Sequence, residues 1–245
     1  MLNDYFKEIT NTLERVKEQE EENLHEAAKM IADCIENDGV VHLFGCGHSH
    51  LLAEEVFYRA GGLAPIHPLL MEDFMLHKGP VRSTKLERMN GAAQAVMEHQ
   101  DIRKGDVMVV ISNSGINPVP IDVALIAKEK GAATIGLTSV SYSKSRPSRH
   151  VKQNHLYEVV DLVIDNHTEA GDALIKHEGV KAKSGPSSTV VGAAILNGIF
   201  VQAVQLLIDR GIDPPVFLSG NLKGADEHNQ QLIDKYKKRI PLLRQ

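Results

Sequence analysis

The chain of 245 residues contains no tryptophan, and all aromatic residues together make up only 4% of it. Alanine, valine, isoleucine and leucine are abundant instead. This balance disfavours a β-sandwich and favours helices that pack on a parallel sheet rich in β-branched residues. The length suffices for one large or two small domains, and we expect a single domain over residues 1–245.

Cysteine is scarce, since Cys34 and Cys46 are the only two and they form no CxxC pair. A disulfide framework is therefore excluded. The amino-terminal residues are charged almost from the start and lack the apolar centre of a signal peptide. No apolar run reaches the roughly 18 residues that a membrane-spanning helix needs. We expect a cytoplasmic protein that does not bind membranes.

The chain also has no excess of positive charge, since its formal net charge is −5 and its isoelectric point is about 6.2. The chain thus lacks the basic footprint of a nucleic-acid-binding protein, and we expect no nucleic-acid partner. An anionic small molecule would have to be held by local hydrogen-bond donors rather than by the overall electrostatic field.

What is present is an alternation of apolar segments with two different periodicities. Short continuous apolar runs predict strands at residues 40–44, 63–70, 107–111, 133–137 and 158–164. Spacings of three and four predict helices at residues 2–36, 49–60, 85–99, 118–130, 187–210 and 226–238. Residues 71–84, 140–155 and 167–186 are predicted to be loops. The alternation indicates a doubly wound α/β domain with right-handed crossovers and a helical amino-terminal arm.

The loops that follow three of these strands are rich in glycine and in small hydroxyl residues. Gly45–His50 follows the first strand, Ser112–Gly115 the central one, and Thr138–Ser139 the next. Ligands of open α/β sheets bind just beyond the carboxyl ends of the strands. Glycine lets backbone N–H groups approach an anion, and a helix amino terminus adds unpaired donors. Turn formation alone also favours these residue types, but two such loops on neighbouring strands favour a phosphate site.

Three segments resemble the SIS (sugar isomerase) family of phosphosugar isomerases and phosphosugar-binding regulators. They read LFGCGHSHLLAEEV, GDVMVVISNSGINPVPIDVALIAKEKGAATIGLTS and SGPSSTVVGAAILNGI. The second carries the most specific pattern, a strand followed by S-x-S-G, a helix, another strand and Thr-Ser. The resemblance covers about residues 28–209 and is nearest to uncharacterised phosphoheptose isomerase-like proteins.

The resemblance implies a three-layer α/β/α domain of flavodoxin-like or Rossmann-like type with a five-stranded parallel sheet. It also implies a homodimer or homotetramer with ligand sites near the subunit interfaces. Together with the loop composition, it indicates that the phosphosugar is bound by Gly47, Ser49, Ser112, Asn113, Ser114, Gly115, Asn117, Thr138 and Ser139, with Arg88, Ser187 and Ser188 as further candidates.

Aldose–ketose isomerisation needs a base near C1 and C2 of the sugar and usually an acid that opens the ring. Glu87 is the first candidate for the base, since a helix at this place often borders the site in proteins that this chain resembles. Glu55, on the helix after the first glycine-rich loop, is a second candidate, and His48 inside that loop could open the ring. Each of them is also open to the plainer interpretation of a solvated surface side chain.

Some phosphoheptose isomerases use zinc and carry a histidine and a glutamate one turn apart on the helix after the first loop. The matching stretch here has Glu55 and Arg59. Because arginine cannot ligate zinc, this departure speaks against both zinc and a phosphoheptose substrate. We therefore expect no metal and no cofactor.

Two functions stay open. One is an enzyme, either an isomerase or a lyase or etherase that acts on an amino-sugar phosphate, and the other is a sensor that binds a phosphosugar without converting it. Residues 2–36 lack helix-turn-helix spacing, which argues against a transcriptional regulator. A dinucleotide-binding oxidoreductase is disfavoured because His50 stands where GxGxxG needs its third glycine. A serine hydrolase is disfavoured because the sequence has no GxSxG motif.

Overall fold

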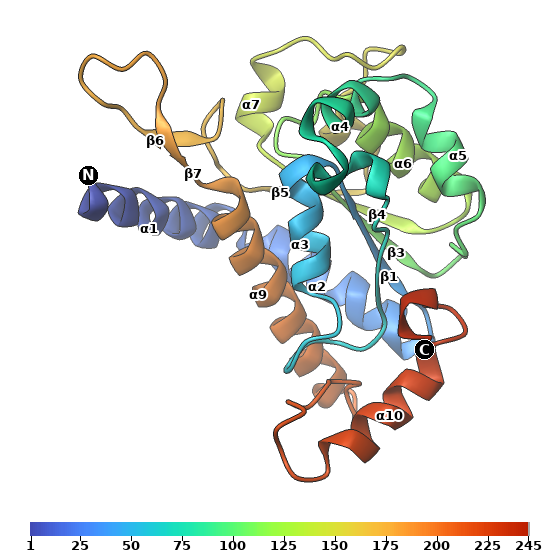
Figure 1. The fold of residues 1–245 in the computed structure, drawn as a ribbon. Coiled ribbons are helices and arrows are strands. Elements are labelled where there is room, and N and C mark those ends of the chain that lie inside the picture. Colours follow the sequence, from blue (N-terminus) through green and yellow to red (C-terminus); the bar gives the residue numbers. More distant parts are fainter. Residues whose placement is uncertain (245) are drawn as a thin grey trace.

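The computed structural model describes residues 1–244 of the chain. Its centre is a five-stranded parallel sheet with the strand order β2-β1-β3-β4-β5 (Figure 1). The strands are β1 (Val41–Gly45), β2 (Ile66–Pro68), β3 (Val107–Ile111), β4 (Ala133–Thr138) and β5 (Leu162–Asp165). Helices cover both faces, so the predicted three-layer α/β/α fold is confirmed.

One face of the sheet is covered by α2 (Glu21–Glu36), α3 (His50–Glu55) and α9 (Ser188–Asp209). The opposite face is covered by α4 (Pro80–Glu87), α5 (Ala92–Glu98), α6 (Pro118–Glu129) and α8 (Leu156–Val159). The other helices are α1 (Leu2–Gln19), α7 (Val140–Lys144), α10 (Ala225–Tyr236) and the short 3₁₀ helices η1 (Gly47–Ser49), η2 (Glu72–Phe74), η3 (Leu76–Lys78) and η4 (Pro241–Leu243).

The two covered faces explain why the strands read as continuous apolar runs. In β3, Val109 and Ile111 belong to the core on the side of α2 and α9, whereas Met108 and Val110 belong to the core on the side of α6. The carboxyl ends of β1, β3 and β4 lie side by side, because these strands are parallel neighbours. This edge of the sheet, called the carboxyl edge below, carries the loops that we expect to bind a ligand.

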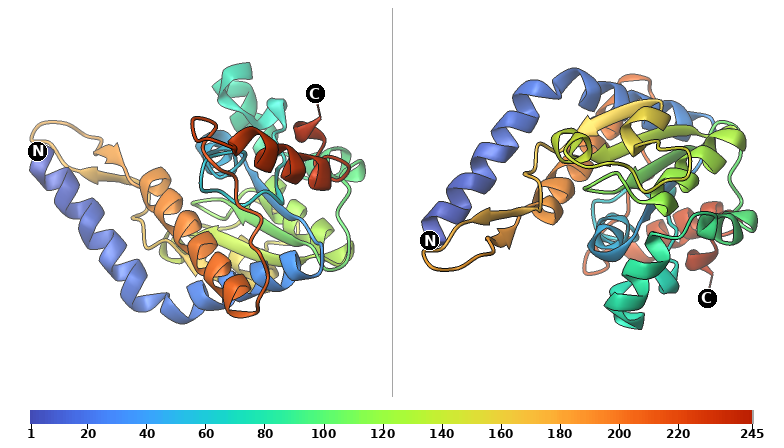
Figure 2. Two further views of the ribbon diagram at one scale, coloured as in Figure 1. Left: turned by 90° about the horizontal axis from the view of Figure 1, so that it is seen from below. Right: turned by 90° about the horizontal axis from the view of Figure 1, so that it is seen from above.

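An arm projects from this body (Figures 1 and 2). α1 extends away from the sheet, and the antiparallel hairpin of β6 (Ala173–Ile175) and β7 (Ser184–Pro186) lies beside it. The Tyr5 hydroxyl donates to the carbonyl of Pro186 across 2.8 Å. The single predicted amino-terminal helix is therefore two helices that meet at Glu20, and a predicted loop contains a hairpin.

Several element boundaries differ from the prediction. Residues 80–84, predicted as loop, form the start of α4, because a proline fits the first turn of a helix. Residues 140–144, also predicted as loop, form α7. Residues 158–159, predicted as strand, belong to α8, since a short apolar run does not distinguish a buried helix from a strand. α3 ends at Glu55, before the predicted end of its helix.

α9 has the length and the apolar composition of a membrane-spanning segment, which the search for continuous apolar runs did not reveal. It packs against α2, and Ile195, Ile199 and Phe200 belong to the core. Of its most apolar window, 44% is buried inside the protein. Core helices commonly have this composition, and α9 is such a core helix, with exposed apolar residues on its outer face.

Candidate functional site

The loop Ser112–Asn117 connects β3 to α6 at the carboxyl edge. The carbonyl groups of residues 114–116 all accept hydrogen bonds from the segment that follows β4. The donors are the Ser143 hydroxyl and the N–H groups of Leu156 and Arg149, and both backbone bonds are 2.9 Å long. The carbonyls of this loop are thus turned toward the protein and held there.

Several N–H groups of the same loop, unlike its carbonyl groups, have no hydrogen-bond partner in the described part of the protein. Within residues 1–244, no hydrogen bond engages the N–H groups of Ser114, Ile116 and Asn117. Pro118 and Pro120 contribute no N–H group to the first turn of α6, so among its first three residues only Val119 can donate one. Backbone N–H groups without a partner are the kind of donor that binds an anion, so this loop is a candidate phosphate site.

Gly115 allows this loop to turn, with a φ of +61°. A Cβ atom there would lie 2.5 Å from the Ser143 hydroxyl and 2.8 Å from the Thr138 hydroxyl. We expect Gly115→Ala to lower the free energy of unfolding by about 2–5 kcal/mol, because left-handed backbone and overpacking both cost energy. Urea unfolding followed by circular dichroism measures the loss.

The matched control for this variant is Gly61→Ala. Gly61 has a φ of +78°, but nothing lies within 4 Å of its added Cβ. Only the backbone penalty of about 1–2 kcal/mol then applies. Equal losses in the two variants would show that the loop Ser112–Asn117 is not closely packed around Gly115.

Glu87, Asn117 and Arg149 form a hydrogen-bonded chain beside the loop. The Asn117 amide donates to Glu87 Oε1 across 2.8 Å, and the Arg149 guanidinium donates to Asn117 Oδ1 across 2.8 Å. Asn117 is buried just before α6, Glu87 ends α4, and Arg149 comes from the segment after β4. Because Arg149 occupies the amide oxygen, the NH₂ group of Asn117 faces the carboxylate.

The carboxyl group of Glu87 lies between the two glycine-rich loops. α4 packs against η1 in the loop after β1, and burial together with the charge of Glu87 raises the pKa of the Cys46 thiol in that loop. Burial also raises the pKa of Glu87 itself, against the opposing effects of the Asn117 hydrogen bond and the charges of Arg88 and Arg149. A carboxyl group with a raised pKa beside a binding loop is a candidate general base.

The first glycine-rich loop folds tightly back on itself. A Cβ atom on Gly45 would lie 2.6 Å from backbone atoms of Ser49, so this close approach requires glycine. His50 is buried, and its Nδ1 atom contacts the carbonyl of Gly47. Ser49 is partly exposed and His48 is exposed, so both residues are accessible at the carboxyl edge.

Three of the expected ligand residues are engaged inside the protein. Ser139 Oγ donates to the carbonyl of Thr168 across 2.6 Å, and Thr138 Oγ1 donates to the carbonyl of Asn113 across 3.3 Å. Asn113 Oδ1 accepts hydrogen bonds of 2.8 Å from Asn166 and Thr168. These groups hold the loop Ser112–Asn117 and its surroundings in place, a role that the sequence did not distinguish from direct ligand contact.

The start of α9 is capped by Asp172. Its carboxylate accepts the N–H groups of Ser187 and Ser188 at 3.0 and 2.7 Å, and the Ser188 hydroxyl at 2.7 Å. The position that favours an anion at this helix terminus is therefore filled by a side chain of the same protein. Both serines, predicted as further ligand residues, are bound to Asp172, which sequence reasoning did not single out.

Glu55, the last residue of α3, forms an ion pair with Arg59, which follows the helix. Together with Thr189 they line an open groove of about 600 Å³ between α3 and α9. Among residues 1–244, no group of three or more His, Cys, Asp or Glu side chains is arranged to hold a metal ion. Because the carboxylate of Glu55 is taken up by Arg59, which is no metal ligand, these donors do not fit a zinc ion.

Arg149 is the site residue that the sequence alone did not reveal. It follows Asn117 by 32 residues and lies in a polar segment without apolar periodicity. The available signal was topological: the segment follows β4, whose carboxyl end lies beside the end of β3. Polar segments that follow a neighbouring parallel strand are therefore also candidates for ligand contact.

A parallel α/β sheet with an S-x-S-G loop at its carboxyl edge is the arrangement of SIS domains. The sequence model described as "SIS domain" matches residues 4–139, and the chain belongs to this family. Within it, the chain is 58% identical to the UPF0309 protein of Geobacillus kaustophilus, over 99% of this chain and 97% of that protein. It is 53% identical to the UPF0309 protein of Listeria innocua, over 99% of this chain and 98% of that protein.

Several solved structures share the fold. The phosphoheptose isomerase GmhA of Neisseria gonorrhoeae matches with a TM-score of 0.54 and 16% identity, over 84% of this chain and 96% of that chain. The sugar isomerase domain of an RpiR transcription factor from Sphaerobacter thermophilus matches with a TM-score of 0.51 and 13% identity, over 97% and 98%. At these identities the likeness shows the fold alone, and it includes both an enzyme and a regulator.

Proposed function

We propose that this protein binds a sugar phosphate at the carboxyl edge and interconverts its aldose and ketose forms. The free N–H groups of Ser114, Ile116 and Asn117 and the hydroxyls of Ser112 and Ser114 hold the phosphate. The observation that carries the proposal is the carboxyl group of Glu87, which is hydrogen-bonded to Asn117 at the end of the same loop.

In this proposal Glu87 is the base. It takes the proton from the carbon next to the carbonyl carbon, while the proton of the neighbouring hydroxyl moves to the carbonyl oxygen, which gives an enediolate that carries its negative charge on the former hydroxyl oxygen. Return of the proton to the other carbon completes the isomerisation. The pKa of Glu87 is raised by burial, which makes its carboxylate a stronger base at neutral pH. Asn117 keeps the carboxylate oriented, and His48 is the candidate acid for ring opening.

The variant Glu87→Gln tests this assignment, because glutamine can still accept the Asn117 hydrogen bond but cannot take a proton. We expect turnover to fall at least about a hundredfold, while a sugar phosphate still raises the melting temperature. Deuterium exchange from D₂O into C1 and C2 of a sugar phosphate, followed by NMR, measures turnover. The control is Glu98→Gln, an exposed glutamate on α5. Wild-type exchange in Glu87→Gln would remove Glu87 as the base.

A sensor that binds without converting is the second candidate function. The observation that favours it is the ion pair of Glu55 with Arg59. Because this pair engages the second candidate base, catalysis would depend on Glu87 alone among the carboxylates proposed as the base. In the same experiment a sensor would bind a sugar phosphate with no exchange in the wild type. A lyase or etherase acting on an amino-sugar phosphate would instead release a new product.

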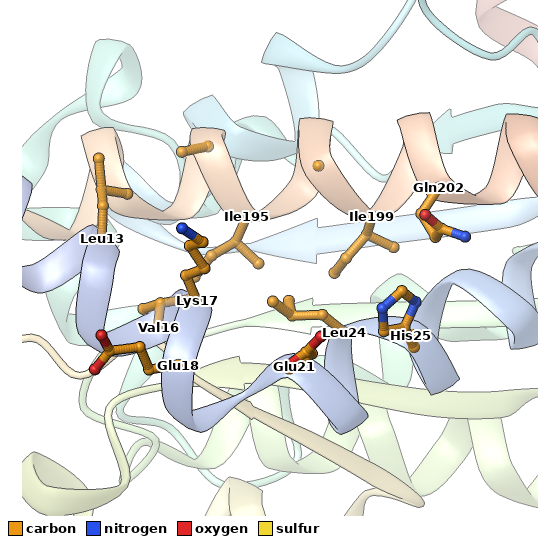
Figure 3. Close-up of a pocket in the computed structure, with 12 residues that line it drawn as sticks. Leu13, Val16, Lys17, Glu18, Glu21, Leu24, His25, Ile195, Ile199 and Gln202 are labelled. Carbon is orange, nitrogen blue, oxygen red and sulfur yellow. The ribbon is translucent and has the colours of Figure 1, made fainter.

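We further propose that the protein is a cytoplasmic homodimer or homotetramer. α9 exposes Val201, at 71%, together with Val190 and Ile208, and α1 exposes Leu2 and Phe6. An apolar groove of about 480 Å³ lies between α1, α2 and α9 (Figure 3). Exposed apolar surface of this kind commonly marks a protein interface, and a second copy would cover it.

The variant Val201→Asp is expected to reduce the particle mass in light scattering to that of a smaller assembly. A charge placed in an apolar interface has to be desolvated without a partner. The control is Gln231→Asp, which adds a charge to an exposed position of α10. An unchanged mass in Val201→Asp would show that α9 does not form the interface.

A further inference from the structure

The segment after β4 concentrates positive charge that the proposed function leaves unused. Lys144, Arg146, Arg149 and Lys152 are all exposed, and residues 139–155 contain no aspartate or glutamate. Within residues 1–244, none of the four forms an ion pair. The whole chain, by contrast, has a net charge of −5. We call residues 144–152 the basic segment.

The basic segment is fixed to the loop Ser112–Asn117 rather than free in solvent. At one end the Ser143 hydroxyl donates to the carbonyl of Ser114. At the other end the Arg149 N–H donates to the loop, while the Arg149 carbonyl accepts a bond from Asn90 across 3.3 Å. His150, only 2% exposed, contacts Asp122 on α6 across 3.0 Å. The cationic side chains are therefore carried by a backbone that is anchored at the rim of the site.

Arg149 joins this segment to the candidate active site. One of its guanidinium N–H groups donates to Asn117, and a guanidinium has five such donors. The remaining donors have the planar fork that binds a carboxylate or a phosphate through two parallel hydrogen bonds. Exposed lysines and arginines are most often only solvated. Arg149 differs from such a residue, because its backbone N–H and C=O groups are both hydrogen-bonded and its guanidinium donates to the buried Asn117.

One phosphate group does not account for this amount of charge. A phosphate monoester carries at most about two negative charges, and the loop already offers it N–H groups and hydroxyls. Arg88, beside Glu87, adds a fifth cation. Clustered charge of one sign raises the local concentration of ligands of the opposite sign, so the rim of this site favours a ligand with more than one anionic group.

We propose that the sugar phosphate bound here carries a second anionic group, a carboxylate or a second phosphate, which Arg149 and the basic segment hold. The inference rests on the proposed function and narrows its substrate class. It also assigns the two ends of the ligand: the first phosphate lies at the loop Ser112–Asn117, and the second anion lies toward the basic segment.

Two pairs of matched probes test this inference by isothermal titration calorimetry. Sorbitol 6-phosphate and 6-phosphogluconate differ at C1, which is a hydroxymethyl group in one and a carboxylate in the other. Fructose 6-phosphate and fructose 1,6-bisphosphate differ by one phosphate. In each pair we expect the wild type to bind the second member about ten- to a hundredfold more tightly, the contribution of one charge-assisted hydrogen-bonded contact.

The readout is the ratio of affinities within each pair, measured for three variants. Arg149→Gln and the triple variant Lys144→Gln, Arg146→Gln, Lys152→Gln are both expected to bring the ratio to within about threefold of one. Lys238→Gln removes an exposed charge beyond α10 and is expected to keep the wild-type ratio. The triple variant decides the question if Arg149→Gln fails to fold.

The outcomes separate this inference from the function on which it rests. Equal affinity of the wild type for both members of each pair would overturn the inference and leave the proposed function standing. A wild-type ratio that survives in the triple variant and in Arg149→Gln would also overturn it. Binding of no probe at all by the wild type would overturn the proposed function together with the inference.

Discussion

A variant that carries both Ser112→Ala and Ser114→Ala is expected to bind sugar phosphates at least about a hundredfold more weakly than the wild type. Each hydroxyl that donates to an ionised phosphate contributes roughly 1.5–3 kcal/mol, so the loss of two corresponds to a factor of a hundred or more. Ser112 is buried directly after β3, and Ser114 lies at the turn of the loop. Calorimetric titration with a sugar phosphate measures the loss.

The stability of this double variant should change much less than its affinity. Ser112 Oγ only accepts the N–H of Gly115 at 3.3 Å, and the loop carbonyls stay bonded to the segment after β4. The combination of Ser184→Ala with Ser219→Ala removes two hydroxyls far from the loop and serves as the control. Wild-type affinity in the loop variant would show that the phosphate binds elsewhere.

The second large effect expected is a loss of stability in mild acid, which arises at the edge of the sheet opposite the ligand site. There His42, on β1, and His67, on β2, are buried with their Nδ1 atoms 3.1 Å apart. His42 Nε2 lies 3.1 Å from Asp106, which is only 1% exposed and also accepts two hydrogen bonds from Arg239, at 2.7 and 3.0 Å. Two ring nitrogens at hydrogen-bond distance share one proton, so at least one of the two rings has to be neutral.

The direction of the pH dependence follows from His67. Burial, and secondly the charge of His42, lowers the pKa of His67 to about 3, whereas an unfolded histidine has a pKa of about 6.5. The unfolded chain therefore binds a proton that the folded chain does not. The stabilisation is fully present above pH 6.5 and is lost as the pH falls toward 3, by up to about 1.4 kcal/mol per pH unit.

Asp106 acts in a different pH range. Burial opposes its ionisation, but hydrogen bonds from His42 and Arg239 hold the pKa of its carboxyl group well below the usual value. Its contribution to stability is present above a pH of about 3.9 and is lost below that value. Between pH 4.5 and 6.5 the loss that we predict from this cluster therefore comes from His67.

The variant His67→Asn tests this explanation, because the amide nitrogen of asparagine can take the place of Nδ1 and has no titration in this range. We expect its free energy of unfolding to fall less steeply between pH 6.5 and 4.5 than that of the wild type, by roughly 1 kcal/mol per pH unit. Urea unfolding at a series of pH values measures both curves. Parallel curves would show that His67 is not the group responsible.

The central unit of the fold was predictable from the sequence because its signals are local. Val107–Ile111 is apolar throughout, as a strand buried on both faces has to be, and the following Ser-Asn-Ser-Gly and the prolines mark the loop and the start of α6. The prediction of a strand over residues 158–164 is wrong at its start, since α8 comes first and β5 begins only at Leu162. Leu156 and Val159 are buried under the sheet as helix residues, and apolar character alone does not separate the two states.

The candidate site was predictable only in part, for a similar reason. Ser112, Ser114 and Asn117 stand in one short stretch whose spacing is visible in the sequence. Other contacts join residues that lie far apart in the chain. Asp172 accepts hydrogen bonds from Ser187 and Ser188, and Arg149 donates to Asn117. Such contacts depend on how the loops fold over the sheet edge, and no local propensity encodes them.

The most direct measurement of where the phosphate binds is a titration of ¹⁵N-labelled protein with a sugar phosphate, followed by the backbone amide signals. Bonding to phosphate shifts an amide proton strongly, and the N–H groups of Ser114, Ile116 and Asn117 are among the donors that the loop leaves free. We predict that these three signals show the largest shifts and that they stay unmoved in the variant with Ser112→Ala and Ser114→Ala. The largest shifts at the start of α9 or in the groove beside α1, with an unmoved loop, would contradict the phosphate site proposed here.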